Sequence, residues 1–133
     1  MTEVSDIISH ELSLFISQNI ESLAMLETLF FLKRTREQEW TADALAKELR
    51  SNSSAIRELL SKLGKRGLIK PGKDPALFRY DPETAQLDNT VEKLSALYLR
   101  YPMRIIDEIY SPQKRAIRNF ADAFKLKKEN ENG

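Results

Sequence analysis

The side chains with the clearest chemistry lie between residues 52 and 80, in a run that begins NSSAIRELLSKLGKRGLI. Serine hydroxyls and cationic groups recur there, and proteins use these donors to bind phosphate oxygens. Residues 33–80 contain twelve Lys or Arg and six acids, although the whole chain has a net charge of only +1. A locally basic segment is typical of a protein that binds a polyanion. The alternative is a solvated surface of mixed charge.

Other kinds of site lack the residues that they need. The chain has no cysteine, which excludes disulfides, thiolate nucleophiles and cysteine-based metal sites. His10 is the only histidine, and Glu37 and Glu39 have no histidine beside them, so we predict no metal and no cofactor. No glycine-rich phosphate loop, nucleophile elbow or acid/base pair is found. A binding protein is therefore predicted, and an enzyme is not.

The N-terminal segment MTEVSDIISHELS carries acids but no Lys or Arg. It therefore lacks the basic start and apolar run of a secretory signal. No uninterrupted apolar run is long enough to span a bilayer. We expect a cytoplasmic protein that has no membrane partner.

The elements that must position these side chains are mostly helical, because apolar residues recur every three or four positions along most of the chain. Thr41 and Asn52 are good N-cap residues, and Gly67 is a good left-handed C-cap. Pro102 should break the helical pattern. We expect helices over residues 4–19, 23–35, 42–50 and 53–66, from residue 88 onward with a break at Pro102, and over about 112–127.

Strands are predicted in only one part of the chain. Leu68–Lys70 and Leu77–Tyr80 flank a stretch rich in Pro and Gly, which indicates a hairpin. Trp40 precedes a helix cap, where core packing is favoured over ligand stacking. The predicted fold class is mainly α with a small β-hairpin.

A buried helix, a short helix, a tight turn, a further helix and a hairpin follow one another in this prediction. The order resembles the winged helix-turn-helix fold. The segment ALAKELRSNSSAIRELLSKLGKRGLI is similar to the A-x-x-L…S-x-x-L-x-x-L-x-x-x-G-L-I pattern of MarR-like and ArsR-like bacterial regulators. Ala46 is small enough for two helices to cross closely, and Leu49, Ile56, Leu60 and Leu63 suit their shared core. The segment EIYSPQKRAIRNFADAFKLKK also resembles the ending of a group of small bacterial winged-helix proteins.

The resemblance suggests how the 133 residues are organised. Residues 1–20 are expected to form an N-terminal helix, and residues 21–81 the winged helix-turn-helix domain. Residues 82–128 are expected to form a C-terminal helical extension. Residues 129–133 are too polar to fold alone and are expected to be disordered.

In winged-helix regulators the second helix of the motif enters the major groove, and the wing contacts the backbone or the minor groove. The resemblance therefore implies double-stranded DNA as a partner. Arg57 suits a two-pronged contact to guanine. The DNA-contacting residues implied are Ser53, Ser54, Arg57, Glu58, Ser61, Lys62, Lys65, Arg66, Lys70, Lys73 and Arg79.

Three residues depart from the pattern of these regulators. Arg50 stands where the turn usually has Gly, Ser51 where an apolar residue is usual, and Glu58 where a cation is common. An acid that faces phosphates is repelled by them. The departures keep open a second function, a non-catalytic module that uses this fold to dock a regulatory or transcription protein.

A further apolar pattern predicts helix pairing. Its residues are spaced 4, 3, 4, 3 and 4, as in a short coiled coil or a packed helix pair. They are Leu87, Val91, Leu94, Tyr98, Tyr101 and Ile105. We expect them to form the interface of a homodimer that reads two DNA half-sites, as a bacterial transcription regulator. Packing within one chain is the alternative for the same residues.

Overall fold

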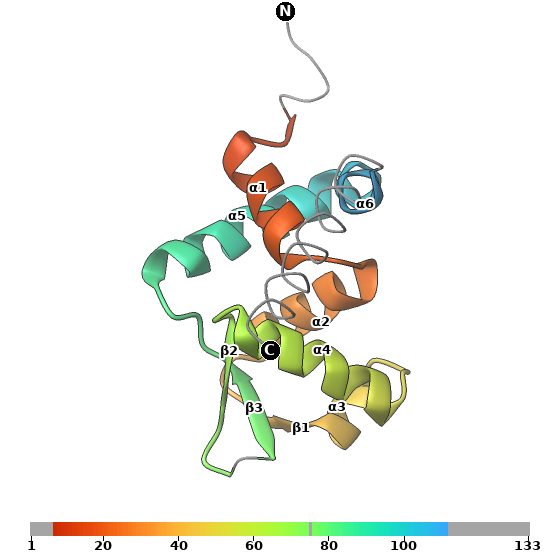
Figure 1. Ribbon diagram of the computed structural model, residues 1–133, viewed down its shortest axis with the longest axis vertical. Coiled ribbons are helices and arrows are strands. Elements are labelled where there is room, and N and C mark those ends of the chain that lie inside the picture. The colour runs from red at the N-terminus through yellow and green to blue at the C-terminus, as the bar shows by residue number, and fades with distance from the viewer. Residues whose placement is uncertain (1–6, 75, 112–133) are drawn as a thin grey trace, which may run out of the picture. The chain divides into compact units, whose positions relative to one another are not determined.

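The computed structural model describes residues 7–74 and 76–111 (Figure 1). These residues are mainly helical and contain a small three-stranded antiparallel sheet, which confirms the predicted class. The elements are α1 (His10–Asn19), α2 (Leu23–Arg34), β1 (Trp40–Thr41), α3 (Ala42–Glu48), α4 (Ser53–Lys65), β2 (Ile69–Pro71), β3 (Leu77–Tyr80), α5 (Ala85–Arg100) and α6 (Pro102–Tyr110). The helix predicted over 112–127 and the tail 129–133 lie outside the described residues.

The chain forms two compact units. Ala24–Glu92 make up one, called here the central unit. The described residues of Met1–Leu23 and Lys93–Gly133 make up the other, the terminal unit. The described residues of the predicted N-terminal helix, and residues 93–111 of the predicted C-terminal extension, thus fall in the same unit. Residues 82–92 fall in the central unit, so the first part of α5 belongs to that unit.

The sheet of the central unit has the strand order β1-β3-β2. The hairpin of β2 and β3 is paired from Ile69 with Tyr80 to Pro71 with Phe78, close to the predicted strands. In Figure 1 this hairpin extends away from the helices of the central unit. Strand β1 was not predicted, because it is only two residues long and exists through its pairing with β3.

Trp40 is half-buried and packs against other side chains of the central unit. Its ring packs edge-on against Phe31, with 5.2 Å between the ring centroids. Its indole Nε1 donates a hydrogen bond of 3.0 Å to the Thr35 hydroxyl. Both polar and apolar parts of the side chain are therefore used to join α2 to β1.

Helices α2, α3 and α4 share the core of the central unit. Ala46 of α3 is only 3% exposed, and this small side chain allows α4 to approach closely. Helix α2 is buried on most faces, as its sequence predicts. The fully buried side chains of these helices are Met25, Leu26, Leu29, Leu32, Leu45, Ile56, Leu60 and Leu63.

The turn between α3 and α4 is left-handed at a residue that is not glycine. Arg50 has φ 54°, and it follows the last residues of α3. The Ser51 N–H donates to the Ala46 carbonyl over 2.8 Å, and the Arg50 N–H donates to the Lys47 carbonyl over 3.3 Å. This is the Schellman pattern of a helix C-terminus, in which glycine is the usual residue at the left-handed position.

The end of α4 uses the same pattern with its usual residue. Gly67 has φ 75°, which confirms the predicted left-handed C-cap. The Leu68 N–H donates to the Leu63 carbonyl over 3.1 Å. A Cβ at Gly67 would come within 2.6 Å of the Glu83 side chain, so this exposed side chain would have to move aside.

The terminal unit contains α1, the second part of α5, and α6. Ser9 caps α1 by accepting from the Leu12 N–H. The Ser13 hydroxyl donates to Glu108 over 2.7 Å, and the Leu23 N–H donates to the Tyr110 hydroxyl over 2.8 Å. Helix α6 begins at Pro102, so the predicted break in the helical pattern is confirmed.

The six side chains predicted for a dimer interface do not share one exposed face. Val91, Leu94 and Ile105 are fully buried within a single chain. Their burial fits the alternative of packing within one chain. The apolar spacing alone could not distinguish the two possibilities, since it does not tell which helix covers these side chains. Leu87 and Tyr98 are half-buried, and Tyr101 is 38% exposed.

Substitutions at the two left-handed positions should change the stability of the fold in opposite directions. Arg50→Gly removes the strain of a side chain at positive φ, so the free energy of unfolding should rise by about 0.5–1 kcal/mol. Gly67→Ala introduces that strain and a crowded Cβ, and should lower it by about 1–2 kcal/mol. Urea unfolding followed by the fluorescence of Trp40 measures both. A loss of stability in Arg50→Gly would show that the turn is not strained.

Candidate nucleic-acid interface

Helix α4 presents one polar face to solvent. Ser54, Arg57, Glu58, Ser61 and Lys65 are all exposed, and they recur every three or four residues, so they lie on one side of the helix. The opposite side is the buried face already described. Asn52 fixes the start of the helix by accepting from the Ala55 N–H over 2.8 Å. Five of the eight predicted contacts in and just after this helix thus share an exposed surface.

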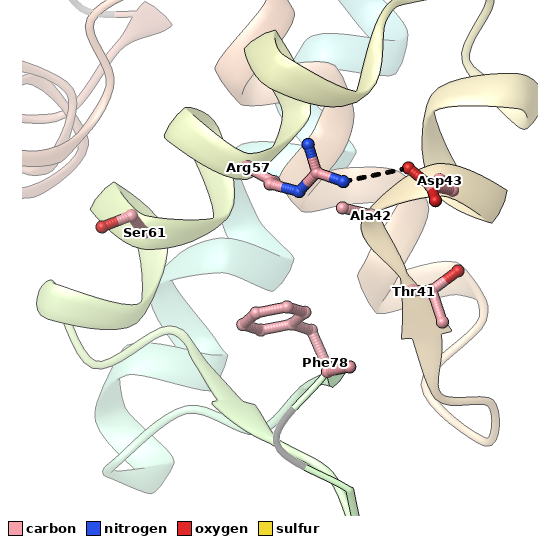
Figure 2. A pocket seen from close by; sticks show the side chains of 7 residues that line it. Thr41, Ala42, Asp43, Arg57, Ser61 and Phe78 are labelled. Carbon is pink, nitrogen blue, oxygen red and sulfur yellow. Dashed lines mark hydrogen bonds and ion pairs between the residues drawn. The ribbon is translucent and has the colours of Figure 1, made fainter.

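Asp43 holds two of the predicted contacts. The Arg57 Nη2 group donates to Asp43 Oδ1 over 3.2 Å (Figure 2). The Ser53 hydroxyl donates to the same oxygen. The Arg57 and Asp43 side chains are 61% and 75% exposed. Asp43 was not predicted to be part of the site. The one sequence signal for its role is its position in the first turn of α3, because this turn packs near the start of α4.

The other charged residues of α4 differ in where they point. Lys62 lies 3.8 Å from Glu58, one turn earlier on the same helix. Arg66 is half-buried, and its Nη1 lies 3.5 Å from the Met25 sulfur on α2. Arg66 was predicted to flank the DNA-contacting face, but it follows the last turn of α4 and turns toward α2.

The hairpin carries the remaining predicted contacts. Lys70 and Arg79 are cross-strand partners, and they lie 3.8 Å and 3.4 Å from the Asp81 carboxylate. Lys73 lies in the turn with an exposed side chain, and its backbone N–H donates to Glu39 over 3.3 Å. Glu39 thus lies against the turn. The charged groups of Lys70 and Arg79 thus have an acid close by, which a count of charges along the sequence does not reveal.

A hollow of about 560 Å³ lies between α4 and the sheet. Its walls include Ala42, Ala76 and the ring of Phe78, with Arg57 and Asp43 at its rim (Figure 2). A second hollow of about 390 Å³ also includes Phe78 and is bounded by β2. Apolar walls with a charged rim are a feature that protein segments use for binding, as well as ligands.

The base of the hairpin is held by a cluster around Tyr80 and Asp88. The Tyr80 hydroxyl donates to Asp88 Oδ1 over 2.7 Å. Lys33 and Arg36 lie 3.5 Å and 3.7 Å from the same carboxylate, and both cations also lie over the Tyr80 ring. The cluster therefore joins β3 to α2 and to the start of α5 within the central unit.

This cluster changes the titration of both of its central groups. Burial and the hydrogen bond to Asp88 raise the pKa of the Tyr80 phenol above its usual value of 10.0. The hydrogen bond from Tyr80 lowers the pKa of Asp88 below its usual value of 3.8, and the Lys33 and Arg36 charges act in the same direction. The neutral phenol and the ionised carboxylate thus stabilise each other.

Residues 7–74 and 76–111 contain neither a candidate metal site nor a candidate membrane-spanning helix. No group of three or more His, Asp or Glu side chains there is placed to hold a metal ion. None of the helices in this part of the chain is long and apolar enough to cross a membrane.

Comparison with known proteins adds no relative. The chain matches no family model, and no curated protein or solved structure is significantly similar to it. Function must therefore be inferred from the geometry of the central unit.

Tyr80→Phe should lower the free energy of unfolding at pH 7 by about 1–2 kcal/mol, because the hydrogen bond to a charged partner is lost. Because the pKa of Tyr80 is raised in the folded state, the neutral phenol stabilises the fold below pH 10. This contribution disappears as the pH rises above 10. Because the pKa of Asp88 is lowered in the folded state, the ionised carboxylate stabilises the fold above pH 3.8. This contribution disappears as the pH falls below that value.

The difference in stability between the wild type and Tyr80→Phe should therefore narrow at both extremes of pH. Urea unfolding followed by circular dichroism at several pH values measures it. The exposed Tyr101, changed to Phe, is the matched control and should leave the pH profile unchanged. A difference that is constant from pH 3 to pH 11 would contradict the role of this hydrogen bond.

Proposed function

We propose that the central unit is a winged helix-turn-helix domain that binds double-stranded DNA, in a cytoplasmic bacterial transcription regulator that acts as a dimer. The order of elements supports this proposal. Helices α2, α3 and α4 are followed by the hairpin of β2 and β3, and a tight turn joins α3 to α4. This is the order of elements in the winged-helix regulators that the sequence resembles.

The main support is the exposed face of α4, which carries Arg57 and Lys65 and belongs to the same unit as the cationic hairpin. Helix α4 has 13 residues, so it is about 20 Å long. An α-helix with its side chains is about as wide as the major groove of B-DNA, roughly 12 Å. The face is therefore of a size to read several base pairs.

The exposed cations divide into two groups by their surroundings. Lys47, Arg50, Lys65 and Lys73 form no ion pair in the part of the chain that the structure describes, and their side chains are free to neutralise phosphates. Arg57, Lys70 and Arg79 instead each have an acidic neighbour, and for Arg57 this neighbour is Asp43. Phosphate contacts by the first group would hold the helix on DNA, and Arg57 would contact a base.

A protein-docking module is the second candidate, and the hollow beside α4 favours it. Phe78, Ala42 and Ala76 give that hollow an apolar wall of a kind that DNA does not need. Asp43, Glu58 and Asp81 also place negative charge near the predicted contacts. In this function α4 and the hairpin would dock a regulatory or transcription protein.

DNA binding should depend strongly on salt. With about five phosphate contacts, the logarithm of the affinity for a random duplex should fall with the logarithm of the salt concentration at a slope near −4 to −5. Fluorescence anisotropy with a labelled duplex measures this slope. The absence of binding at low salt would favour the docking function.

Two substitutions separate the contacts within this experiment. Lys73→Ala should weaken binding to all sequences alike and reduce the slope by about 1. Arg57→Ala should reduce the preference between sequences selected from a random library. If Arg57→Ala leaves both affinity and preference unchanged, α4 does not present this face to the bases.

The proposed dimer would use exposed apolar side chains of the terminal unit. Leu99 is 81% exposed, Met103 is 64% exposed, and Tyr101 lies between them in sequence. These three residues surround the junction of α5 and α6. Side chains of this size and exposure are suited to an interface with a second copy of the chain.

Analytical ultracentrifugation at tens of micromolar protein should find a dimer, and Leu99→Asp should dissociate it. The side chain is exposed, so this change should leave the fold intact. Asn89→Glu, an exposed position nearer the start of the same helix, adds the same charge as a matched control and should leave the dimer intact. A wild-type monomer at this concentration would contradict the dimer.

A further inference from the structure

We propose that Asp43 determines base specificity by holding the Arg57 guanidinium in the orientation in which it binds guanine. The inference rests on the proposed DNA binding, and it assigns a positioning role to a residue that touches no base itself.

The Asp43 carboxylate is itself held in place. Its Oδ1 accepts from Arg57 Nη2 over 3.2 Å and also from the Ser53 hydroxyl. Thr41 fixes the start of the helix that carries Asp43, because its side chain accepts from the Ala44 N–H over 3.1 Å. Ser53 and Arg57 come from the first two turns of α4, so these contacts link the starts of two helices.

The contact leaves most of the guanidinium available. A guanidinium has five N–H donors, and the structure assigns one nitrogen, Nη2, to Asp43. Guanine presents the acceptors O6 and N7 in the major groove, and an arginine binds them with two N–H groups. An arginine that is already held loses less side-chain freedom when it binds, and it is restricted in which acceptors it can reach.

Neither stability nor affinity accounts well for this ion pair. Both side chains are more than half exposed, and exposed ion pairs add little to the stability of a fold. A carboxylate on a surface that binds DNA also repels phosphates, so it weakens binding to every sequence. Specificity is the property that such a residue can increase, because it acts on the one cation that faces the bases.

The test compares Asp43→Asn with Glu48→Gln. Both substitutions remove one negative charge from α3. Glu48 is exposed and makes no contact with Arg57. A selection from random duplexes first identifies the guanine whose preference is lost in Arg57→Ala. Anisotropy then measures affinity for that duplex and for the same duplex with adenine at this position.

The wild type should prefer guanine by about tenfold or more. Asp43→Asn should reduce this preference to about twofold to threefold and should bind random duplexes about twofold more tightly. Glu48→Gln should bind both duplexes more tightly and keep the full preference. Ser53→Ala removes the second donor to the carboxylate, and it should lose part of the preference even if Asp43→Asn does not fold.

The outcomes separate this inference from the proposed function. A wild type that binds no duplex at low salt overturns both. A wild type that prefers guanine through Arg57, with the preference unchanged in Asp43→Asn and in Ser53→Ala, overturns the positioning role alone. Equal gains of affinity for all duplexes in Asp43→Asn and Glu48→Gln would show that Asp43 acts only by its charge.

Discussion

The close crossing of α3 and α4 determines where the polar side chains of the central unit lie. Ala46 is almost completely buried, and a larger side chain there would push the two helices apart. The left-handed turn at Arg50 then directs the chain from one helix into the next. Because α3 packs against α4, Asp43 reaches Arg57 although 14 residues separate them.

Contacts between neighbouring turns, strands and helices explain why a basic sequence yields a surface of mixed charge. Residues 33–80 contain twice as many cations as acids, yet four of the predicted cations in α4 and the hairpin have an acid within 4 Å. They are Arg57, Lys62, Lys70 and Arg79. At physiological salt, charges are screened beyond about 8 Å, so these near neighbours matter more than the sum along the chain. Net charge indicates that a polyanion is a suitable partner, but neighbouring acids decide which cations can reach it.

Local features of this fold were predictable from the sequence. Thr41, Asn52 and Gly67 perform the capping roles expected of their residue types, because a cap depends on a few neighbouring residues. The break at Pro102 was predictable for the same reason.

Features that depend on distant partners were not predictable. Strand β1 exists only because β3 lies beside it, and the burial of Val91, Leu94 and Ile105 depends on which elements cover them. The contacts of Asp43 and Glu39 likewise join separate elements. The candidate site was thus predictable as a list of exposed residues of α4 and the hairpin, but its internal contacts were not.

The acids beside the candidate interface have a physical consequence if that interface binds DNA. Phosphate neutralisation contributes equally to the binding of every sequence, and excess cations would hold the protein on non-specific DNA. Glu39, Asp43 and Asp81 lie beside cations of α4 or the hairpin and reduce this common contribution. A base contact by an arginine that is already oriented is reduced much less, since it depends on hydrogen-bond geometry as well as charge. The ratio of specific to non-specific affinity therefore rises as total affinity falls, and in a genome full of competing sites this ratio decides where a regulator binds.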